Sequence, residues 1–380
     1  MEVIGVIAEY NPFHNGHKCH LEKIKELFPN SLIILILSGN FTQRGEPALI
    51  SKWDRSSIAL QEGVDLVVEL PYPFAAQSAD FFAKGAISLL KELKANYLIF
   101  GSESNDVSTL EKLASIQLND QDYDALCKVY LRSGYNYPTA LSLALKDLTG
   151  ETILMPNDLL GLSYVKEIRK QKAFIKPYTI KRTNSYHSDE LLDVSSASAI
   201  RKALENGEEV SKAVPNSTLS HLHNLHFMND YFPYLKYKVL LENNLDVYQG
   251  VDEGIGPRVR NAILSSTTIT EAISKISTKR YTKQKINRML GHILVGFTKE
   301  EARKMKDIAY IRVLDYSLKG KEYLHSIKKE LTIPLITNYS KLKHDMLSLE
   351  FRTTCVYALT LPFPTQQEEI DEEYKHFPKL

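Results

Sequence analysis

Short apolar runs alternate with longer segments of helical periodicity along the first half of the chain. The first four runs are apolar at successive positions, which is typical of parallel strands buried between helices on both sides of a sheet. The segments between them open with Ser or Asn, residues that commonly cap helix N-termini. The predicted strands are residues 3–8, 32–38, 64–70, 96–102 and 174–180, and the predicted helices are residues 51–63, 78–93 and 157–171.

Repeated strand–helix units of this kind predict an α/β fold, a Rossmann-like doubly wound parallel sheet whose ligand binds at the carboxyl ends of the strands. After about residue 205 the strand runs thin out, whereas helical spacing continues. We therefore expect two domains, residues 1–205 and residues 206–380, the second of them mainly helical. Near the end of the chain, the acidic cluster EEIDEE (368–373) is typical of a solvated helix face.

Composition narrows the class of protein without indicating a partner. The 380 residues are 43% hydrophobic and 24% charged, as in ordinary globular domains, and the net charge of +1 leaves local charge to be examined separately. No stretch approaches the ~20 apolar residues of a membrane span, and the N-terminal run lacks the features of a signal peptide, so we expect no membrane partner. Three widely spaced cysteines, Cys19, Cys127 and Cys355, fit neither a disulfide framework nor a zinc cluster and predict a cytoplasmic location.

The stretch EYNPFHNGHKCH (9–20) carries the first candidate chemistry, because it follows the first predicted strand directly. His14 and His17 would lie on the same side of the first turn of a helix. Unpaired backbone N–H groups and the positive end of the helix dipole make such a turn an anion site, where two imidazoles could donate hydrogen bonds to phosphate oxygens. Gly16 would let a base or ribose approach the backbone closely. The alternative, a pair of surface histidines, fits the position after a buried strand less well.

A second polar cluster lies in VSSASAIRKAL (194–204), where Ser196, Ser198 and Arg201 could form another phosphate clamp at a helix start. Taken alone, a serine-rich helix start indicates only capping. However, HNGH resembles the H-x-G-H signature of the nucleotidylyltransferase superfamily. The second stretch is similar to the S-x-S/T-x-I-R signature that follows the last strand of that fold, so the two signatures stand in the expected order.

The longer strings GVIAEYNPFHNGHKCHL, SGNFTQRGEPALISKWDR, VVELP, FGSE, MPNDLLG and IKR resemble the bacterial tRNA(Met) cytidine acetate ligase family over most of the chain. The resemblance implies an enzyme that uses ATP to activate acetate as acetyl-adenylate. It would then acetylate N4 of the wobble cytidine of elongator tRNA(Met). The implied catalytic residues are His14 and His17, and the implied ATP-binding residues are Ile7, Ala8, Glu9, Tyr10, Asn11, Pro12, Phe13, His14, Asn15, Gly16, His17, Lys18, Cys19, His20, Gly101, Asn157 and Arg182, with Ser196, Ser198 and Arg201 of the second signature.

The residues outside the two signatures allow plainer explanations as well. Gly101 would end a strand on the ligand side, where a small residue permits close approach of a nucleotide. Asn157 would cap a helix, and capping alone could explain it. Arg182 could meet a phosphate or lie on the surface. Arg44 and Lys52, after the second strand, could face phosphate or RNA. The sequence favours this role and its absence equally.

The stretch KISTKRYTKQKINR (275–288) contains six Lys or Arg residues and no acidic residue. A helix after Thr282 would turn Ile286 and Leu290 inward and leave its basic residues exposed to phosphates. A charged, solvated face is the alternative. The predicted RNA-binding residues are Lys279, Arg280, Lys283, Lys285 and Arg288.

The sequence suggests no resident metal. The histidines His221, His223 and His226 lie close together, but nothing near them supplies a third or fourth ligand of another kind. Magnesium could bridge ATP phosphates, although no cage of carboxylates indicates it. Two other functions stay open, a small-molecule adenylyltransferase and a non-catalytic RNA-binding protein, and no pattern indicates an oligomeric state.

Overall fold

A computed structural model describes residues 1–150, 155–182 and 195–376. Its centre is a sheet with strand order β5-β4-β1-β2-β3-β6-β7. All five predicted strands are confirmed, and the mainly parallel α/β architecture with them. The strands are β1 (Val3–Ala8), β2 (Leu32–Ser38), β3 (Leu66–Leu70), β4 (Tyr97–Ser102), β5 (Lys176–Lys181), β6 (Ile311–Tyr316) and β7 (Leu335–Ile336).

Strands β1 to β5 are parallel to one another, with Val3 opposite Leu32 at the start of the central β1–β2 pair. Strand β6 lies antiparallel to β3 and extends the sheet with a segment from the second half of the chain. The expectation of few strands after residue 205 was therefore incomplete, because it did not include β6. It missed β6 because Arg312 and Asp315 interrupt the apolar pattern of that strand, although both side chains are buried.

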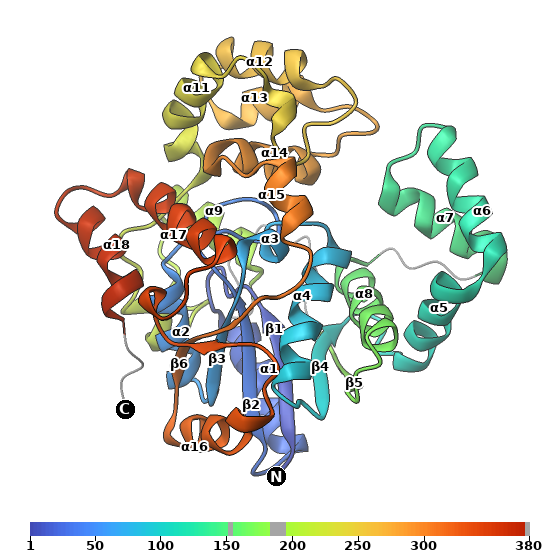
Figure 1. The fold of residues 1–380 in the computed structure, drawn as a ribbon, viewed down its shortest axis with the longest axis vertical. Helices are drawn as coiled ribbons and strands as arrows, with labels where there is room; N and C mark the ends of the chain where they lie inside the picture. The colour runs from blue at the N-terminus through green and yellow to red at the C-terminus, as the bar shows by residue number, and fades with distance from the viewer. Residues whose placement is uncertain (151–154, 183–194, 377–380) are drawn as a thin grey trace.

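Helices cover both faces of the sheet, as the apolar runs predicted (Figure 1). Ile24 and Ile58, from α1 and α2, pack on one face, and Phe82 and Val165, from α4 and α8, belong to the core of the other. The helices up to residue 205 are α1 (Asn15–Leu27), α2 (Lys52–Gln61), α3 (Tyr72–Ala75), α4 (Ala79–Glu92), α5 (Val107–Asn119), α6 (Gln121–Arg132), α7 (Tyr137–Thr149), α8 (Pro156–Lys170) and α9 (Ala197–Glu205).

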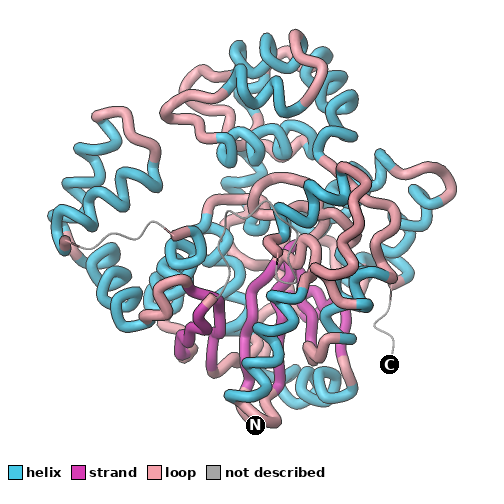
Figure 2. Tube along the Cα trace, turned by 180° about the vertical axis from the view of Figure 1, so that it is seen from behind, coloured by secondary structure: helices cyan, strands magenta, loops and turns pink. Residues whose placement is uncertain are grey.

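Two helical units project from this core in different directions, as the two opposite views show (Figures 1 and 2). The first is an arm of α5, α6 and α7, in a stretch with no predicted element. The second unit contains α11 to α14. Within the described ranges, no helix is long and apolar enough to cross a membrane. The later α-helices are α10 (Asn216–Leu219), α11 (Phe232–Leu241), α12 (Gly256–Leu264), α13 (Ile269–Ile276), α14 (Lys283–Val295), α15 (Lys299–Lys304), α16 (Leu318–Ile327), α17 (Asp345–Tyr357) and α18 (Thr365–Lys375).

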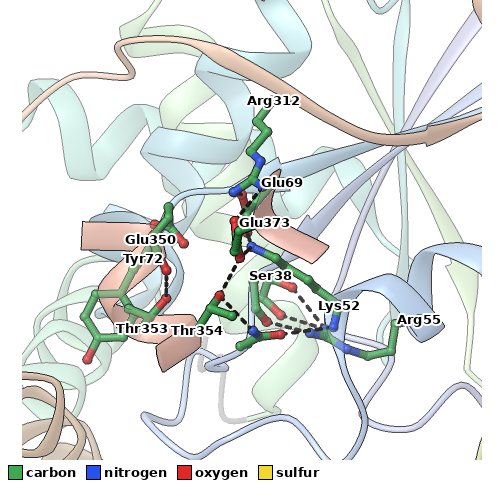
Figure 3. A network of polar contacts seen from close by, with 12 residues as sticks. Ser38, Lys52, Arg55, Glu69, Tyr72, Arg312, Glu350, Thr353, Thr354 and Glu373 are labelled. Carbon is green, nitrogen blue, oxygen red and sulfur yellow. Dashed lines mark hydrogen bonds and ion pairs between the residues drawn. The ribbon is translucent and has the colours of Figure 1, made fainter. Parts of the chain in front are cut away.

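A buried network of charges joins the beginning of the chain to its end (Figure 3). Lys52 Nζ lies 2.7 Å from Glu69 Oε1 and 2.6 Å from Glu373 Oε1. Arg312 contacts the other oxygens of the same two carboxylates, at 3.1 Å and 2.6 Å. Lys52 therefore faces neither phosphate nor RNA. The expectation of a fully solvated acidic cluster was also wrong, because Glu373 of that cluster is completely buried in this network.

The charges of this network balance. Burial alone would raise the pKa of Glu373, but Arg312 and Lys52 lower it to about 2. A third buried carboxyl, that of Glu350, has its pKa raised well above the usual value by burial and by Glu69. In the ion pairs themselves, Lys52 and Arg312 face Glu69 and Glu373, and such pairing is the condition under which buried charges are tolerated.

Replacing Arg312 by Met should test this interpretation, because it leaves Glu69 and Glu373 facing Lys52 alone. We expect the free energy of unfolding to fall by about 3–5 kcal/mol, the usual cost of breaking a buried ion pair from one side. Urea unfolding followed by circular dichroism measures it. Arg303→Met, at an exposed position on α15, is the matched control and should change stability by about 0.5 kcal/mol or less. A similar small loss for Arg312→Met would contradict the balanced-network interpretation.

Candidate active site

The loop between β1 and α1 places two histidines side by side. His14 is the N-cap of α1, and buried Leu21 and Ile24 hold that helix against the sheet. The His14 and His17 rings stack with centroids 3.7 Å apart and planes 20° apart. The prediction that the two imidazoles lie on one side of the first turn is confirmed.

Their hydrogen bonds leave donor and acceptor capacity unused. The backbone N–H of His14 donates to Nδ1 of His17 at 3.3 Å, so a neutral His17 carries its proton on Nε2. Among the described residues, Nδ1 of His14, Nε2 of His20 and the hydroxyl of Tyr10 have no hydrogen-bond partner, although all three atoms are buried. Buried polar atoms are normally paired. Three orphaned atoms within eleven residues therefore mark a place where a ligand is expected to supply the partners.

The site's electrostatics keep these histidines neutral. Burial, assisted by the nearby Arg182 guanidinium, lowers the pKa of His14 to about 4 and that of His20 to about 4. Burial also lowers the pKa of His17 well below its usual value, with further contributions from His14 and Arg182. Neutral imidazoles can donate a hydrogen bond to a phosphate without having to pair with a buried counter-charge.

The second serine-rich stretch lies against the first loop. Ser196 caps α9 by accepting from the backbone N–H of Ala199 at 3.2 Å. Nη1 of Arg201 donates to the carbonyl oxygen of Asn11 at 2.7 Å. The hydroxyl of Ser198 lies 3.4 Å from both Arg201 and Arg44. The structure thus brings the two signatures together, although 179 positions separate His17 from Ser196 along the chain, since each signature lies at a helix start on the same sheet edge.

Gly101 of β4 lies beside the side chain of Arg182, which directly follows β5. A Cβ atom at Gly101 would lie 3.1 Å from Cγ of Arg182, so glycine here makes room for the arginine side chain. Asn157 does not cap α8, contrary to our expectation. Met155 occupies the N-cap position, and the Asn157 amide donates instead to Glu103 Oε1 at 2.5 Å, because the loop after β4 folds over the start of α8.

These groups line one cavity of about 1050 Å³ at the carboxyl edge of the sheet. Four arginines, Arg44, Arg182, Arg201 and Arg288, give it a positive lining suited to a polyphosphate. The predicted ATP-site residues found in its wall are Ile7, Ala8, Glu9, Tyr10, Asn11, His14, Gly16, His17, Cys19, His20, Gly101, Asn157, Arg182, Ser196, Ser198 and Arg201.

Four residues of the predicted ATP segment are outside the lining and have other contacts. Pro12 and Phe13 are buried, and the Phe13 carbonyl accepts from the Thr218 hydroxyl at 3.0 Å. The Asn15 side chain donates to the Lys212 carbonyl at 2.8 Å, and Lys18 lies 3.9 Å from Glu62. These residues therefore support the loop from behind.

Three of the five predicted RNA-binding residues are exposed, and the other two are partly buried. Lys279, Arg280 and Lys283 are exposed, as expected. Lys285 lies with Nζ 3.8 Å from the centroid of the Tyr281 ring. The expectation that Arg288 is exposed was wrong, because α14 packs so closely on Gly45 that Arg288 turns into the cavity wall, where burial lowers its pKa.

The structure also shows residues that sequence patterns did not assign to the site. Arg44, which the sequence left undecided, lines the cavity with Gln43, and Gln284 of α14 joins them. In the sequence, Gln43 and Arg44 are marked only by their position after a buried strand, and Gln284 only by its position on a basic helix. Neither position indicates that the side chain reaches this cavity. The signal for Arg288 was its charge, which predicted contact with an anion but not this location.

We find no grouping of three or more His, Cys, Asp or Glu side chains suited to a metal in the described ranges. His221 instead contacts Asp54 at 2.9 Å, and His226 contacts the Tyr231 hydroxyl at 2.7 Å. Because the cavity offers no carboxylate cage, any magnesium would have to be held chiefly by phosphate oxygens of a bound nucleotide.

Comparison with known proteins agrees with this geometry. The family described as HIGH Nucleotidyl Transferase matches residues 1–373. A Geobacillus sp. protein named tRNA(Met) cytidine acetate ligase is 40% identical over 400 residues, with 100% of each chain covered. A protein of the same name from Anoxybacillus flavithermus is 39% identical over 396 residues, with 99% of each chain covered. The crystal structure of Thermotoga maritima TmcAL bound with alpha-thio ATP is 31% identical, with a TM-score of 0.88, and the match covers 97% of this chain and 96% of that one.

The low pKa of His20 predicts a pH dependence of stability. Between about pH 6.5 and pH 4 the unfolded chain binds a proton at this position and the folded chain does not, so the free energy of unfolding falls as pH falls through that window. At pH 5 this single group should cost about 2 kcal/mol. In His20→Asn, the difference in unfolding free energy between about pH 7.5 and pH 5 should shrink by that amount, as urea titrations at the two pH values can measure.

The matched control for this prediction is His325→Asn, which changes an exposed histidine on α16. It should keep the pH dependence of the unaltered chain. An equal pH dependence in the His20→Asn variant and the unaltered chain would show that His20 is protonated in the folded state.

Proposed function

The chain belongs to the HIGH nucleotidyl transferase family, and from this premise we propose that it is an ATP-dependent tRNA(Met) cytidine acetate ligase. It activates acetate as acetyl-adenylate and transfers the acetyl group to N4 of the wobble cytidine of elongator tRNA(Met), forming N4-acetylcytidine. The observation that carries the proposal is the convergence of HNGH and Ser198–Arg201 around one cavity with unpaired histidine nitrogens. The names of the full-length relatives support the choice of substrates.

In the first half of the reaction, an acetate oxygen attacks the α-phosphorus of ATP and the bond to the β-phosphate oxygen breaks. Pyrophosphate leaves with that electron pair. Acetate is already ionised at pH 7, so the protein needs no general base here and contributes alignment and charge stabilisation. His14 and His17 donate hydrogen bonds to the phosphates, while Arg44 and Arg201, joined at Ser198, neutralise the departing pyrophosphate.

In the second half, the cytosine amine attacks the acetyl carbonyl and AMP leaves. The cytosine must leave its stack to reach a cavity at the sheet edge. We assign the ATP chemistry to residues 1–205 and tRNA binding to the helical part of residues 206–380, whose strands β6 and β7 complete the sheet. ATP and tRNA are both cytoplasmic, and a reducing cytoplasm also suits the free cysteines Cys19, Cys127 and Cys355.

Two observations favour this function over the open alternatives. A non-catalytic RNA-binding protein would not need buried, unpaired histidine nitrogens beside four arginines. A small-molecule adenylyltransferase would not need the exposed basic residues Lys279, Arg280 and Lys283 on a helical unit that packs against the cavity loop.

The direct test is mass spectrometry of nucleosides from elongator tRNA(Met) incubated with the protein, ATP and isotopically labelled acetate. Labelled N4-acetylcytidine at the wobble position is the expected product. The Geobacillus relative, acting on the same tRNA preparation, is the positive control. If the relative acetylates the tRNA and this protein does not, the ligase proposal is wrong.

His17→Ala should lower the rate of acetate-dependent ATP–pyrophosphate exchange by about 10²–10³, the usual effect of losing one hydrogen-bond donor to developing charge. Exchange of radiolabelled pyrophosphate into ATP measures this half-reaction without tRNA. His223→Ala, which removes an exposed histidine outside the cavity, is the control and should keep the rate. An unchanged rate in His17→Ala would contradict a role for the HNGH stretch in forming the acetyl-adenylate.

The double substitution Lys279→Ala and Lys283→Ala should weaken tRNA binding and reduce the slope of log affinity against log salt by about 1 for each lysine. Fluorescence anisotropy of labelled tRNA over a salt series gives both quantities. Lys304→Ala with Lys329→Ala, two exposed lysines outside α13 and α14, is the matched control. Equal salt slopes in the two double variants would contradict a phosphate-binding role for Lys279 and Lys283.

A further inference from the structure

The cavity continues beyond the histidines onto the opposite face of the sheet. Helix α1 carries His14 and His17 on one face, whereas α4 and α8 pack on the other, with the α5–α7 arm beyond them (Figure 1). We call this second part of the cavity the α4–α7–α8 lobe. Its lining residues are Ser78, Asp80, Phe82, Tyr137, Leu141, Leu145, Leu159, Leu162, Ser163 and Lys166.

The α4–α7–α8 lobe differs chemically from the arginine-rich part. Most of its wall is apolar, and its charged groups are one ion pair between Lys166 and Asp80, whose side chains are 15% and 30% exposed. Tyr137, which is about half exposed, also lines this part of the cavity. Burial and the negative charge of Asp80 raise the pKa of the Tyr137 hydroxyl, so that group stays protonated. Because Lys166 and Asp80 neutralise each other, this lobe offers an anion no net positive charge, unlike the arginine-rich part of the cavity.

The lobe is connected to the place where acetyl-adenylate would form. Glu9, at the end of β1, accepts from the backbone N–H of Gln43 at 2.6 Å. The Glu9 carboxylate also contributes, after burial, to the raised pKa of Tyr164 on α8. Tyr164 in turn packs edge-on against Phe100 of β4, with centroids 5.7 Å apart. Glu9, Tyr164 and Phe100 line the same cavity as the lobe residues and the two histidines, so both parts belong to one cavity.

The volume of the cavity lies just above the usual range for a single small ligand. Cavities that hold one small molecule measure about 300–1000 Å³, and this one measures about 1050 Å³. The proposed reaction brings ATP, acetate and a nucleobase together. The arginines and histidines suit the phosphates of ATP and the acetate, so the adenine of ATP and the cytosine must share the remaining, less charged wall, of which the lobe is a part.

We propose that the α4–α7–α8 lobe receives the flipped cytosine, an inference that rests on the proposed function. The Tyr137 ring stacks on the base, Asp80 accepts a hydrogen bond from the N4 amine, and Lys166 donates to the ring N3 or O2. Uracil would present an oxygen to Asp80 where cytosine presents N–H, so the same pair rejects it. In the transfer step, N4 forms a bond to the acetyl carbon, the bond from that carbon to AMP breaks, and the N4 proton passes to Asp80 and then to solvent.

Two half-reactions separate this role from ATP binding. Asp80→Asn and Tyr137→Ala are compared with the unaltered enzyme in acetate-dependent ATP–pyrophosphate exchange and in transfer of labelled acetate to tRNA. We expect the ratio of transfer rate to exchange rate to fall at least tenfold in each variant. Tyr135→Ala, an exposed tyrosine of the same arm outside the cavity lining, is the matched control and should keep the ratio. The proposal would be wrong if the ratio of transfer rate to exchange rate stayed constant in both variants. This holds whether both rates fall together or neither rate changes.

Recognition of the base can be measured independently of chemistry. A tRNA transcript with wobble uridine is used as a competitive inhibitor, and its inhibition constant is compared with that of a non-reactive cytidine analogue in the same position. We expect Asp80→Asn to reduce this discrimination at least fivefold, and an unchanged discrimination would contradict base reading by Asp80. If the unaltered protein shows no acetate-dependent exchange at all, the proposed ligase function fails, and that result is distinguishable from failure of the lobe assignment.

Discussion

One buried guanidinium holds together the two loops that form the proposed active site. Arg55 of α2 is completely buried and donates to four backbone carbonyls, those of Glu9 at 2.7 Å, Ser38 at 3.0 Å, Gly39 at 2.5 Å and Ile50 at 3.2 Å. Burial lowers its pKa to about 10, so it remains charged at pH 7. Hydrogen bonds to a charged donor contribute about 1.5–3 kcal/mol each. This one cation therefore ties the end of β1 to both ends of the loop that follows β2.

The chemistry of the cavity follows from that arrangement. The β1–α1 loop supplies the histidines, the loop after β2 supplies Gln43 and Arg44, and α9 adds Ser198 and Arg201 across the gap. Each element is held by contacts on its far side, so the buried Nδ1 of His14 and Nε2 of His20 have no hydrogen-bond partner among the described residues. Burying these unpaired nitrogens costs free energy, and stabilising contacts elsewhere in the structure offset that cost.

Local pattern was sufficient for the parts of this molecule that depend on neighbours in sequence. The first four strands are apolar on both faces, and His17 follows His14 by three positions, so period and helix geometry predicted the sheet and the placing of both imidazoles on one side of the first turn. Pattern failed where a residue's partner is distant. Glu373 looked like a solvated acid until Arg312 and Lys52 were seen around it, and Arg288 looked exposed until α14 was seen against Gly45. The α5–α7 arm lacked any motif, and its contribution to the cavity depends wholly on tertiary packing.

The antiparallel strand β6 has a consequence for how the protein is made. Lys52 and Glu69 emerge early in translation, whereas their buried partners Arg312 and Glu373 follow more than 240 positions after Glu69 in the case of Arg312 and later still in the case of Glu373. Until then, β3 is an open sheet edge beside an incomplete set of buried charges, which is a state that favours chaperone binding or aggregation. The sheet and its buried charges are therefore complete only after β6 and α18 have been synthesised and have packed against the first half of the chain.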